Sequence, residues 1–188
     1  MSQRNAVYTG VVVKPRDPKR RGRVQVSLPL FDDVKVWAQR ASLATGDERG
    51  TWFVPDAGDE VLVAFENGDP RRPIVVGALW SAKQRPPESN PERTLLRTKH
   101  GTTIVFDDAA GAVEIEDSNG NAVTLKSSGV TVTCAATVTV TASMVEVRAG
   151  TVTVDAGMSK FSGVVKCDTL IANSVISASY TPGQGNIW

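Results

Sequence analysis

The side chains that could perform chemistry in this chain are few and scattered. The sequence contains one histidine, His100, and two cysteines, Cys134 and Cys167. Asp59 and Glu60 are adjacent carboxylates, but neighbouring residues on a strand point to opposite faces, so they do not form an acid/base pair. No nucleophile motif, phosphate-binding loop or metal-ligand spacing accompanies these residues. We therefore predict a protein that is not an enzyme and that has no catalytic residue, cofactor or bound metal.

Residues 1–82 contain the elements that would have to position such side chains. Five short runs rich in β-branched residues, separated by turns such as "PRDP" and "NGDP", predict five strands. The glycine and proline residues of these turns favour tight reversals of the chain. Five short strands in a segment of this length suit a small closed barrel of the oligonucleotide/oligosaccharide-binding (OB) type.

A basic cluster, "KPRDPKRRGR", lies between the first two predicted strands at residues 14–23. It permits two interpretations, a phosphate-binding loop and a solvated hairpin loop, and the second is the simpler. The whole chain has a formal net charge of +1, so no global field favours a nucleic acid or an anionic membrane. Single-strand binding also needs exposed aromatic rings for base stacking, and we expect Trp37 to pack inside the barrel. An OB-fold nucleic-acid-binding protein therefore stays an alternative only.

The segment from residue 36 to residue 80, "VWAQRASLATGDERGTWFVPDAGDEVLVAFENGDPRRPIVVGALW", carries the most specific pattern in the chain. It resembles the OB domain of the central spike of contractile injection machines, namely the phage baseplate spike proteins and the VgrG proteins of type VI secretion. The residues that carry the resemblance are Trp37, Arg40, Gly46, Gly50, Phe53, Pro55, Gly58, Asp59, Glu60, Val61, Phe65, Gly68, Asp69, Pro70, Pro73, Gly77 and Leu79. Their types indicate a structural motif, in which glycine and proline set turns and the aromatic side chains fill the barrel core.

The chain changes character after a proline-rich segment, residues 83–98, which predicts a linker. Short alternating runs then follow, and they are broken at Gly101, Gly111 and Asn119-Gly120. Apolar doublets recur at steps of 7, 8, 7 and 7 residues, mostly as valine with threonine between. The doublets are Val123/Leu125, Val130/Val132, Val138/Val140, Val145/Val147 and Val152/Val154. This internal repeat predicts a repeat architecture for a neck and shaft over residues 99–160.

A single chain cannot bury this repeat. Five units make too few turns for a single-chain triangular solenoid, and a flat Val/Thr sheet with open edges would aggregate. Three chains wound about one axis bring the valines together on that axis, where aromatic side chains do not fit. We therefore predict an all-β homotrimer in which the five-stranded OB barrel is followed by an intertwined triple-stranded β-helix, or β-prism; the resemblance implies the same shaft. Cys134 is expected either at the axis or in a corner.

Residues 161–188 form the predicted tip. Apolar pairs become more closely spaced here, and the residues predicted to dock a partner are Tyr180, Pro182, Gly183, Gly185 and Trp188. A terminal tryptophan is expected to be buried in the trimer or covered by a partner. Some spikes of the resembled family carry a His-x-His pair that binds iron near the tip, and this sequence has no such pair. In related machines a PAAR-repeat protein docks on the trimer's end, so the resemblance implies a PAAR-repeat tip protein as a partner.

The patterns and the resemblance together predict a mechanical function. The barrels would attach the trimer to the baseplate or tail hub protein, and the shaft would pierce the target cell envelope on sheath contraction, with transient contact with its membrane. The N-terminal residues lack a signal-peptide pattern, so we expect assembly in the cytoplasm. The absence of a hub domain before the barrel favours a phage tail, a tailocin or an extracellular contractile injection particle, outside the cell after release. A trimeric tail-fibre or adhesin stalk is the alternative for the C-terminal half.

Overall fold

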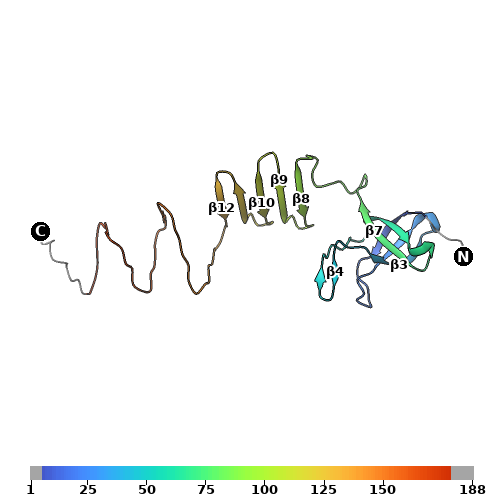
Figure 1. Ribbon diagram of the computed structural model, residues 1–188, viewed down its shortest axis with the longest axis horizontal. Coiled ribbons are helices and arrows are strands. Elements are labelled where there is room, and N and C mark those ends of the chain that lie inside the picture. The colour runs from blue at the N-terminus through green and yellow to red at the C-terminus, as the bar shows by residue number, and fades with distance from the viewer. Residues whose placement is uncertain (1–5, 179–188) are drawn as a thin grey trace. The chain divides into compact units, whose positions relative to one another are not determined.

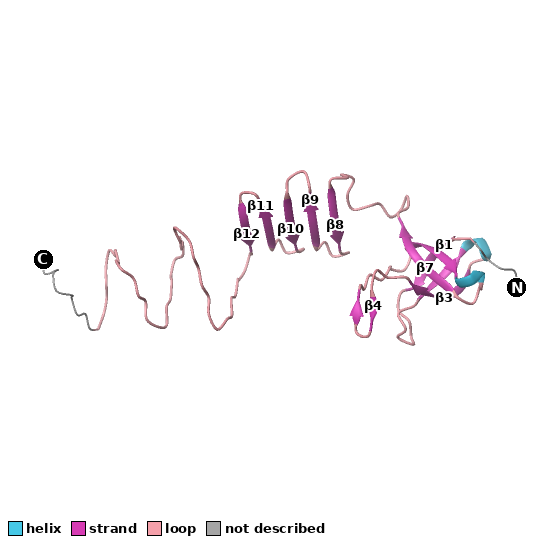
Figure 2. Cartoon of the chain, viewed as in Figure 1, coloured by secondary structure: helices cyan, strands magenta, loops and turns pink. Residues whose placement is uncertain are grey.

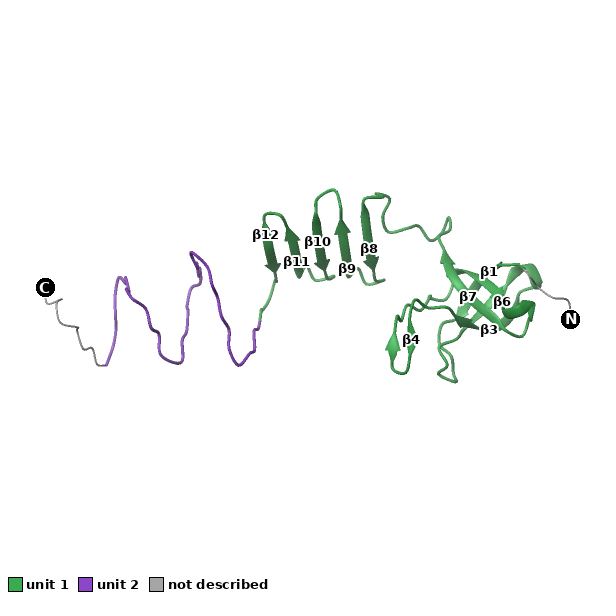
Figure 3. Ribbon diagram, in the orientation of Figure 1, with its two compact units in different colours: residues 1–138 green, residues 139–188 purple. Residues whose placement is uncertain are grey.

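The computed structural model describes residues 6–178 and divides the chain into two units, residues 1–138 and residues 139–188 (Figure 3). Every regular strand of the described residues lies in the first unit, which contains a closed barrel and a separate five-stranded sheet (Figures 1 and 2). The helices of the described part are two 3-10 turns, η1 (Pro29–Phe31) and η2 (Glu66–Gly68). The prediction of an all-β chain is confirmed. No helix in residues 6–178 has the length and apolar character needed to cross a membrane.

The barrel is closed by five strands in the order β1-β2-β3-β7-β6, which fits the predicted OB domain. Its strands are β1 (Tyr8–Lys14), β2 (Val24–Leu28), β3 (Val34–Arg40), β6 (Glu60–Phe65) and β7 (Pro73–Leu79). Strands β3 and β7 pair in parallel, and the other neighbours are antiparallel. A small hairpin, β4 (Thr45–Gly46) and β5 (Arg49–Gly50), lies in the connection between β3 and β6.

The core of the barrel consists mainly of valine. The side chains with no exposed surface are Val24, Val26, Ala38, Val61 and Val63. Within each strand these residues are two positions apart, because successive side chains of a strand point alternately inward and outward. Phe65 is 7% exposed, and its ring packs edge-on against Tyr8 with the centroids 5.6 Å apart. The prediction that aromatic residues of the motif fill the core is therefore confirmed for Phe65.

The prediction that Trp37 packs inside the barrel is wrong. Ala38 occupies the buried position of β3, so the adjacent Trp37 points outward, where it is half-buried. The guanidinium of Arg23 lies 5.6 Å from the centre of the Trp37 ring. Phe53 also lies outside the core, with 65% of its surface exposed. The motif identifies these aromatic residues, but the pairing of the strands decides which face each one occupies.

A five-stranded antiparallel sheet follows the barrel in the sequence. It is a meander in the order β12-β11-β10-β9-β8, as Figure 1 shows. Its strands are β8 (Arg93–Arg97), β9 (Thr103–Asp107), β10 (Ala112–Glu116), β11 (Ala122–Lys126) and β12 (Gly129–Thr133). Gly101, Gly111 and Gly120 have positive φ angles in the first three turns, which confirms the breaks predicted there. Strand β8 begins inside the range 83–98 suggested as a linker, because Arg93–Arg97 pairs with the edge of β9.

The later valine doublets begin at Val138, the last residue of the first unit, and continue through the second unit. Residues 134–178 have no regular strand within one chain, and Figure 2 shows this segment as loop. The doublet side chains are between 61% and 71% exposed, and they are Val138, Val140, Val145, Val147, Val152 and Val154. One chain by itself therefore leaves these valines in water.

Candidate assembly face

Two apolar rows run across the sheet β8–β12. The register of the strands places Thr94, Phe106, Val113, Leu125 and Val130 next to one another. The same register aligns Leu96, Ile104, Ile115, Val123 and Val132. Directly paired residues share a face, and residues two apart on a strand share it too, so both rows lie on one side of the sheet. We call this side the apolar face.

The apolar face is open in the single chain. Phe106 is 47% exposed, Ile115 is 43% exposed and Val130 is 68% exposed. Soluble monomers rarely expose contiguous apolar surface of this kind, and such a surface marks a site of association. The geometry therefore identifies the apolar face as the candidate assembly site. It is exposed to solvent unless another surface covers it.

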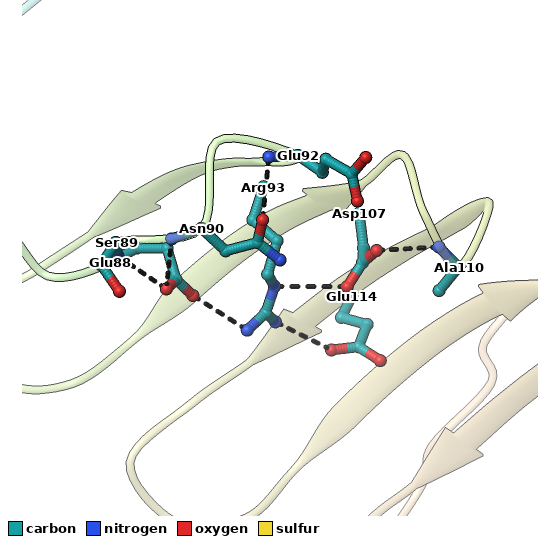
Figure 4. A network of polar contacts seen from close by, with 8 residues as sticks. All are labelled: Glu88, Ser89, Asn90, Glu92, Arg93, Asp107, Ala110 and Glu114. Carbon is teal, nitrogen blue, oxygen red and sulfur yellow. Dashed lines mark hydrogen bonds and ion pairs between the residues drawn. The ribbon is translucent and has the colours of Figure 1, made fainter.

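The opposite side of the sheet is mainly polar, and its apolar residues Val105 and Ala112 are already buried within one chain, at 7% and 6% exposure. Arg93 lies on this side at the start of the edge strand β8, with Nη1 3.0 Å from Glu88 Oε2 and Nη2 3.9 Å from Glu114 Oε2 (Figure 4). Its buried Nε lies 3.3 Å from Asp107 Oδ2, a charge contact without the alignment of a hydrogen bond. Three carboxylates from the entering loop, β9 and β10 thus surround one guanidinium. This cluster attaches the entering chain to the polar side and leaves the apolar face uncovered.

Glu88 and one further carboxylate, Asp117, organise backbone at the ends of this sheet. Glu88 accepts hydrogen bonds from the backbone N–H groups of Asn90 and Ser89, and these contacts together with Arg93 lower the pKa of Glu88. Asp117 accepts hydrogen bonds from the side-chain and backbone N–H groups of Asn121 and Asn119, which lower its pKa to about 2. The carboxylates therefore stabilise the loop before β8 and the turn between β10 and β11 in their charged forms.

The structure brings together four of the predicted shaft residues. Val123, Leu125, Val130 and Val132 lie side by side on the apolar face, with Val123 opposite Val132 and Leu125 opposite Val130. The other six predicted shaft residues lie between 138 and 154, outside the sheet, and nothing within one chain pairs them. Their common axis stays a prediction.

Sequence reasoning missed the half of the apolar face that comes from β8–β10. Phe106, Ile104 and Ile115 were not singled out, because they lie before the regular valine repeat. The signal was the large apolar residues two positions apart, Ile104 and Phe106 in "TIVFD" and Val113 and Ile115 in "AVEIE". A face that includes Phe106 is also wider than the valine strip alone predicts.

The residues considered for chemistry lie apart from one another. His100 is exposed in the turn between β8 and β9. Asp59 accepts hydrogen bonds from the Asp56 backbone N–H and from Gln84 Nε2, so it caps a turn before β6. Cys134 follows β12, with its Sγ 3.5 Å from the Thr137 carbonyl oxygen. Both cysteines are free thiols in this chain.

Arg40 is the motif residue whose side chain joins two loops of the barrel. It donates from Nε to the Gly22 carbonyl oxygen at 3.0 Å and from Nη1 to the Phe53 carbonyl oxygen at 2.6 Å. Its guanidinium lies 4.5 Å from the centre of the Trp52 ring, and burial lowers its pKa. Arg40 thus joins the β1–β2 loop to the segment after the β4–β5 hairpin.

The glycine, proline and acidic residues of the motif lie mainly at turns. Gly50 has a φ of +140°, and a Cβ there would overlap the carbonyl oxygen of Ala44. Gly68 has a φ of +73° in η2, and the following Asp69 binds the Arg71 guanidinium and backbone N–H, which lower the pKa of Asp69 to about 2. Of the remaining motif residues, Gly46 lies in β4, and the others precede β6 or lie in or next to β6 and β7. These others are Pro55, Gly58, Glu60, Pro70, Pro73, Gly77 and Leu79. These positions support the structural interpretation of the motif.

The predicted tip residues Tyr180, Pro182, Gly183, Gly185 and Trp188 lie outside the described residues. The prediction that they dock a partner is therefore untested.

Comparison with known proteins accounts for both regions of the first unit. Residues 8–80 match the type VI secretion system/phage-baseplate injector OB domain, and they contain all strands of the barrel. Residues 93–158 match the phage baseplate V C-terminal trimerisation domain, which begins at the first residue of β8 and includes the whole apolar face. The chain belongs to the family of VgrG-like baseplate spikes. Its family assignment thus agrees with the resemblance in the sequence.

Curated relatives in this family include spike proteins of two bacteria. The type VI secretion system spike protein VgrG3 of Vibrio cholerae is 32% identical over 108 residues, which cover 50% of this chain and 11% of the relative. The type VI secretion system spike protein VgrG1a of Pseudomonas aeruginosa is 28% identical over 128 residues, covering 60% of this chain and 19% of the relative. A further relative is the actin cross-linking toxin VgrG1 of Vibrio cholerae, at 32% identity over 108 residues, covering 50% of this chain and 10% of the relative. The chain thus spans less than a fifth of the length of these three relatives.

Proposed function

We propose that three copies of this chain form the central spike of a contractile injection machine. The observation that carries the proposal is the apolar face, which is uncovered in one chain and lies inside the segment matched by a trimerisation domain. Three such faces turned toward one axis remove their apolar rows from water together. The polar side, with Arg93 and its carboxylates, then faces outward.

In the proposed trimer the valine doublets after residue 134 continue the apolar face toward the tip. Each chain supplies one strand per level of an intertwined β-helix, so that Val138, Val145 and Val152 meet their counterparts on the axis. A strand that lacks a partner in its own chain finds one in a neighbouring chain, which satisfies its backbone groups. The outward threonines keep a high propensity for strand formation while they contact water.

The proposed role of the trimer is structural and not enzymatic. The barrels attach it to a baseplate or tail hub protein, and contraction of a sheath drives the shaft through the target envelope. A PAAR-repeat protein covers the end formed by residues 161–188. Assembly takes place in the cytoplasm, and the finished machine is a phage tail, a tailocin or an extracellular injection particle. The spike proteins among the relatives support this mechanical role.

Light scattering of the purified chain tests the trimer directly. A chain of 20.0 kDa is expected to give three times that mass, and the trimer is expected to persist after brief heating in detergent because three chains must unravel together. A monomer at the same concentration would overturn the trimer and with it the spike. A trimer that dissociates in detergent without heating would support trimerisation and contradict the intertwined shaft.

A further inference from the structure

The β1–β2 loop and the β4–β5 hairpin together carry an arginine cluster that lies outside the apolar face and the shaft. Its members are Arg16, Arg20, Arg21 and Arg49, and none of their guanidinium groups makes an ion pair or a hydrogen bond within residues 6–178. The loop concentrates positive charge in a chain whose net charge is only +1. An uncompensated cluster in an otherwise balanced protein points to an anionic partner.

The loop that carries this cluster is held in one conformation. Asp17 accepts hydrogen bonds from the backbone N–H groups of Lys19 and Arg21. Its two oxygens also bind Arg23, from Nε at 2.8 Å and from Nη2 at 3.0 Å. The loop therefore presents its free arginines in a preorganised arrangement, and a ligand does not have to order it first.

The arginines border two adjoining hollows on the barrel. One hollow has a volume of about 510 Å3, and Arg16 and Arg20 line it. The other has a volume of about 700 Å3, and Arg20, Arg21 and Arg49 line it. Both share Arg40 and Trp52, so they form one continuous basic surface around a central aromatic side chain. We call it the basic hollow.

Acidic residues at this surface do not neutralise it. Asp17 is engaged by Arg23, and Asp56 pairs with Lys99 at 3.0 Å. Glu48, in the turn of the small hairpin, is the one further acid that lines the basic hollow. Four unpaired arginines therefore face one carboxylate with no ion pair among the described residues.

The centre of the basic hollow has the composition of a protein-binding site. Trp52 is 70% exposed, and Arg40 stacks on it while its own hydrogen bonds hold it in place. Tryptophan and arginine are enriched among the residues that contribute most to protein–protein binding. Single-stranded nucleic acids instead need several exposed rings for successive bases, and here Arg40 lies over Trp52 while Arg23 lies over Trp37.

We propose that the basic hollow binds an acidic segment of a partner protein, with an apolar side chain of that segment against Trp52. Carboxylates of the segment accept charge-assisted hydrogen bonds from Arg16, Arg20, Arg21 and Arg49. If the partner is the hub protein, the barrel attaches to the hub through the basic hollow. In that case the inference rests on the proposed function. The binding surface itself is complete within one barrel.

Calorimetric titration of the full chain with a synthetic peptide of aspartate and glutamate around a central leucine tests the proposal. The Arg20→Glu/Arg21→Glu variant is expected to bind at least about tenfold more weakly, which corresponds to about 1.4 kcal/mol. The matched control, Lys83→Glu/Arg85→Glu, reverses two exposed charges away from the basic hollow and is expected to bind as the original chain does. Trp52→Ala is expected to weaken binding of the peptide with the central leucine. Binding of the same peptide with alanine in place of the leucine is expected to stay unchanged.

Three results would overturn the proposal. They are no binding of the peptide by the full chain, equal binding by the Arg20→Glu/Arg21→Glu variant, and tighter binding of an oligothymidine strand, which would favour a nucleic acid instead. Light scattering of the same samples separates these failures from a failure of the proposed function. A trimer that does not bind the peptide contradicts only the proposed binding by the basic hollow. A monomer that binds the peptide contradicts only the proposed trimeric spike.

Discussion

The barrel and the sheet β8–β12 use similar short strands rich in valine, but they bury their apolar side chains differently. In the barrel Val24, Val26 and Val61 have no exposed surface, because the sheet closes on itself around them. In the sheet Val130 and Val132 are 68% and 59% exposed. The sheet has two free edges, and its apolar side is left open by the residues that the structure describes. The barrel and the sheet thus differ less in composition than in whether the sheet closes on itself.

The difference has a mechanical consequence. A closed barrel stabilises each chain separately, so it can present a docking surface in every protomer. An open apolar face makes stability depend on the neighbouring chains, and obligate assembly of this kind makes folding and association inseparable. The two regions therefore predict separate responses to mutation.

The largest effect is expected from Val140→Asp, which places three carboxylates on the proposed axis. Each unpaired buried charge costs several kcal/mol, so the trimer should be lost while the barrel still folds. Light scattering measures the mass, and amide hydrogen exchange in the strands of the barrel reports whether the barrel is folded. Thr139→Asp is the matched control, because the proposed shaft turns this adjacent side chain outward, and the trimer of this variant should persist. A stable Val140→Asp trimer would contradict the inward position of Val140.

Leu28→Ala tests the barrel, the other region of the comparison. Leu28 is 2% exposed in the barrel core, and its truncation is expected to lower the free energy of unfolding of the barrel by about 2–5 kcal/mol. The trimer mass is expected to stay unchanged, because the shaft buries a different set of side chains. Leu30→Ala, at a position 74% exposed, should change stability by no more than about 0.5 kcal/mol. Loss of the trimer in Leu28→Ala would show that the two regions are not independent.

Trp37→Ala should have a smaller effect. Outside the core, Trp37 contributes a cation–π contact with Arg23 of about 0.5–1 kcal/mol and some packing. Thermal unfolding of the barrel measures the change. A loss of about 3–5 kcal/mol, the usual cost of truncating a core tryptophan, would place the ring inside the barrel after all.

The smallest effect is expected from acid titration of the turn at Asp117. The hydrogen bonds of this carboxylate lower its pKa from 3.8 to about 2, so its stabilisation is present above pH 3.8 and is lost as the pH falls through about 2. Asp117→Asn should lower the melting temperature slightly at neutral pH, and the difference should vanish near pH 2. Asp108→Asn, at an exposed carboxylate, serves as the control. A difference that persists unchanged at pH 2 would exclude the charged carboxylate as its cause.

Much of the barrel and of the sheet could be predicted from local patterns. Alternating β-branched runs and turns such as Asn67-Gly68 indicate strands and reversals, because they act over a few neighbouring residues. Gly101, Gly111 and Gly120 marked the turns of the sheet for the same reason, since positive φ angles favour glycine. The side on which Trp37 lies could not be predicted, because it depends on which residue of β3 faces the barrel axis.

The sequence by itself determined the strands, their turns and the valine repeat, since each depends on propensity and period within a short window. Only the tertiary structure decided how distant residues share a surface. Strand register placed Phe106 beside Val113 and Val113 beside Leu125 on the apolar face, and it brought Asp107 and Glu114 to Arg93 on the other side. Pairing between strands sets these neighbours, and a shift of one residue would move every side chain to the opposite face.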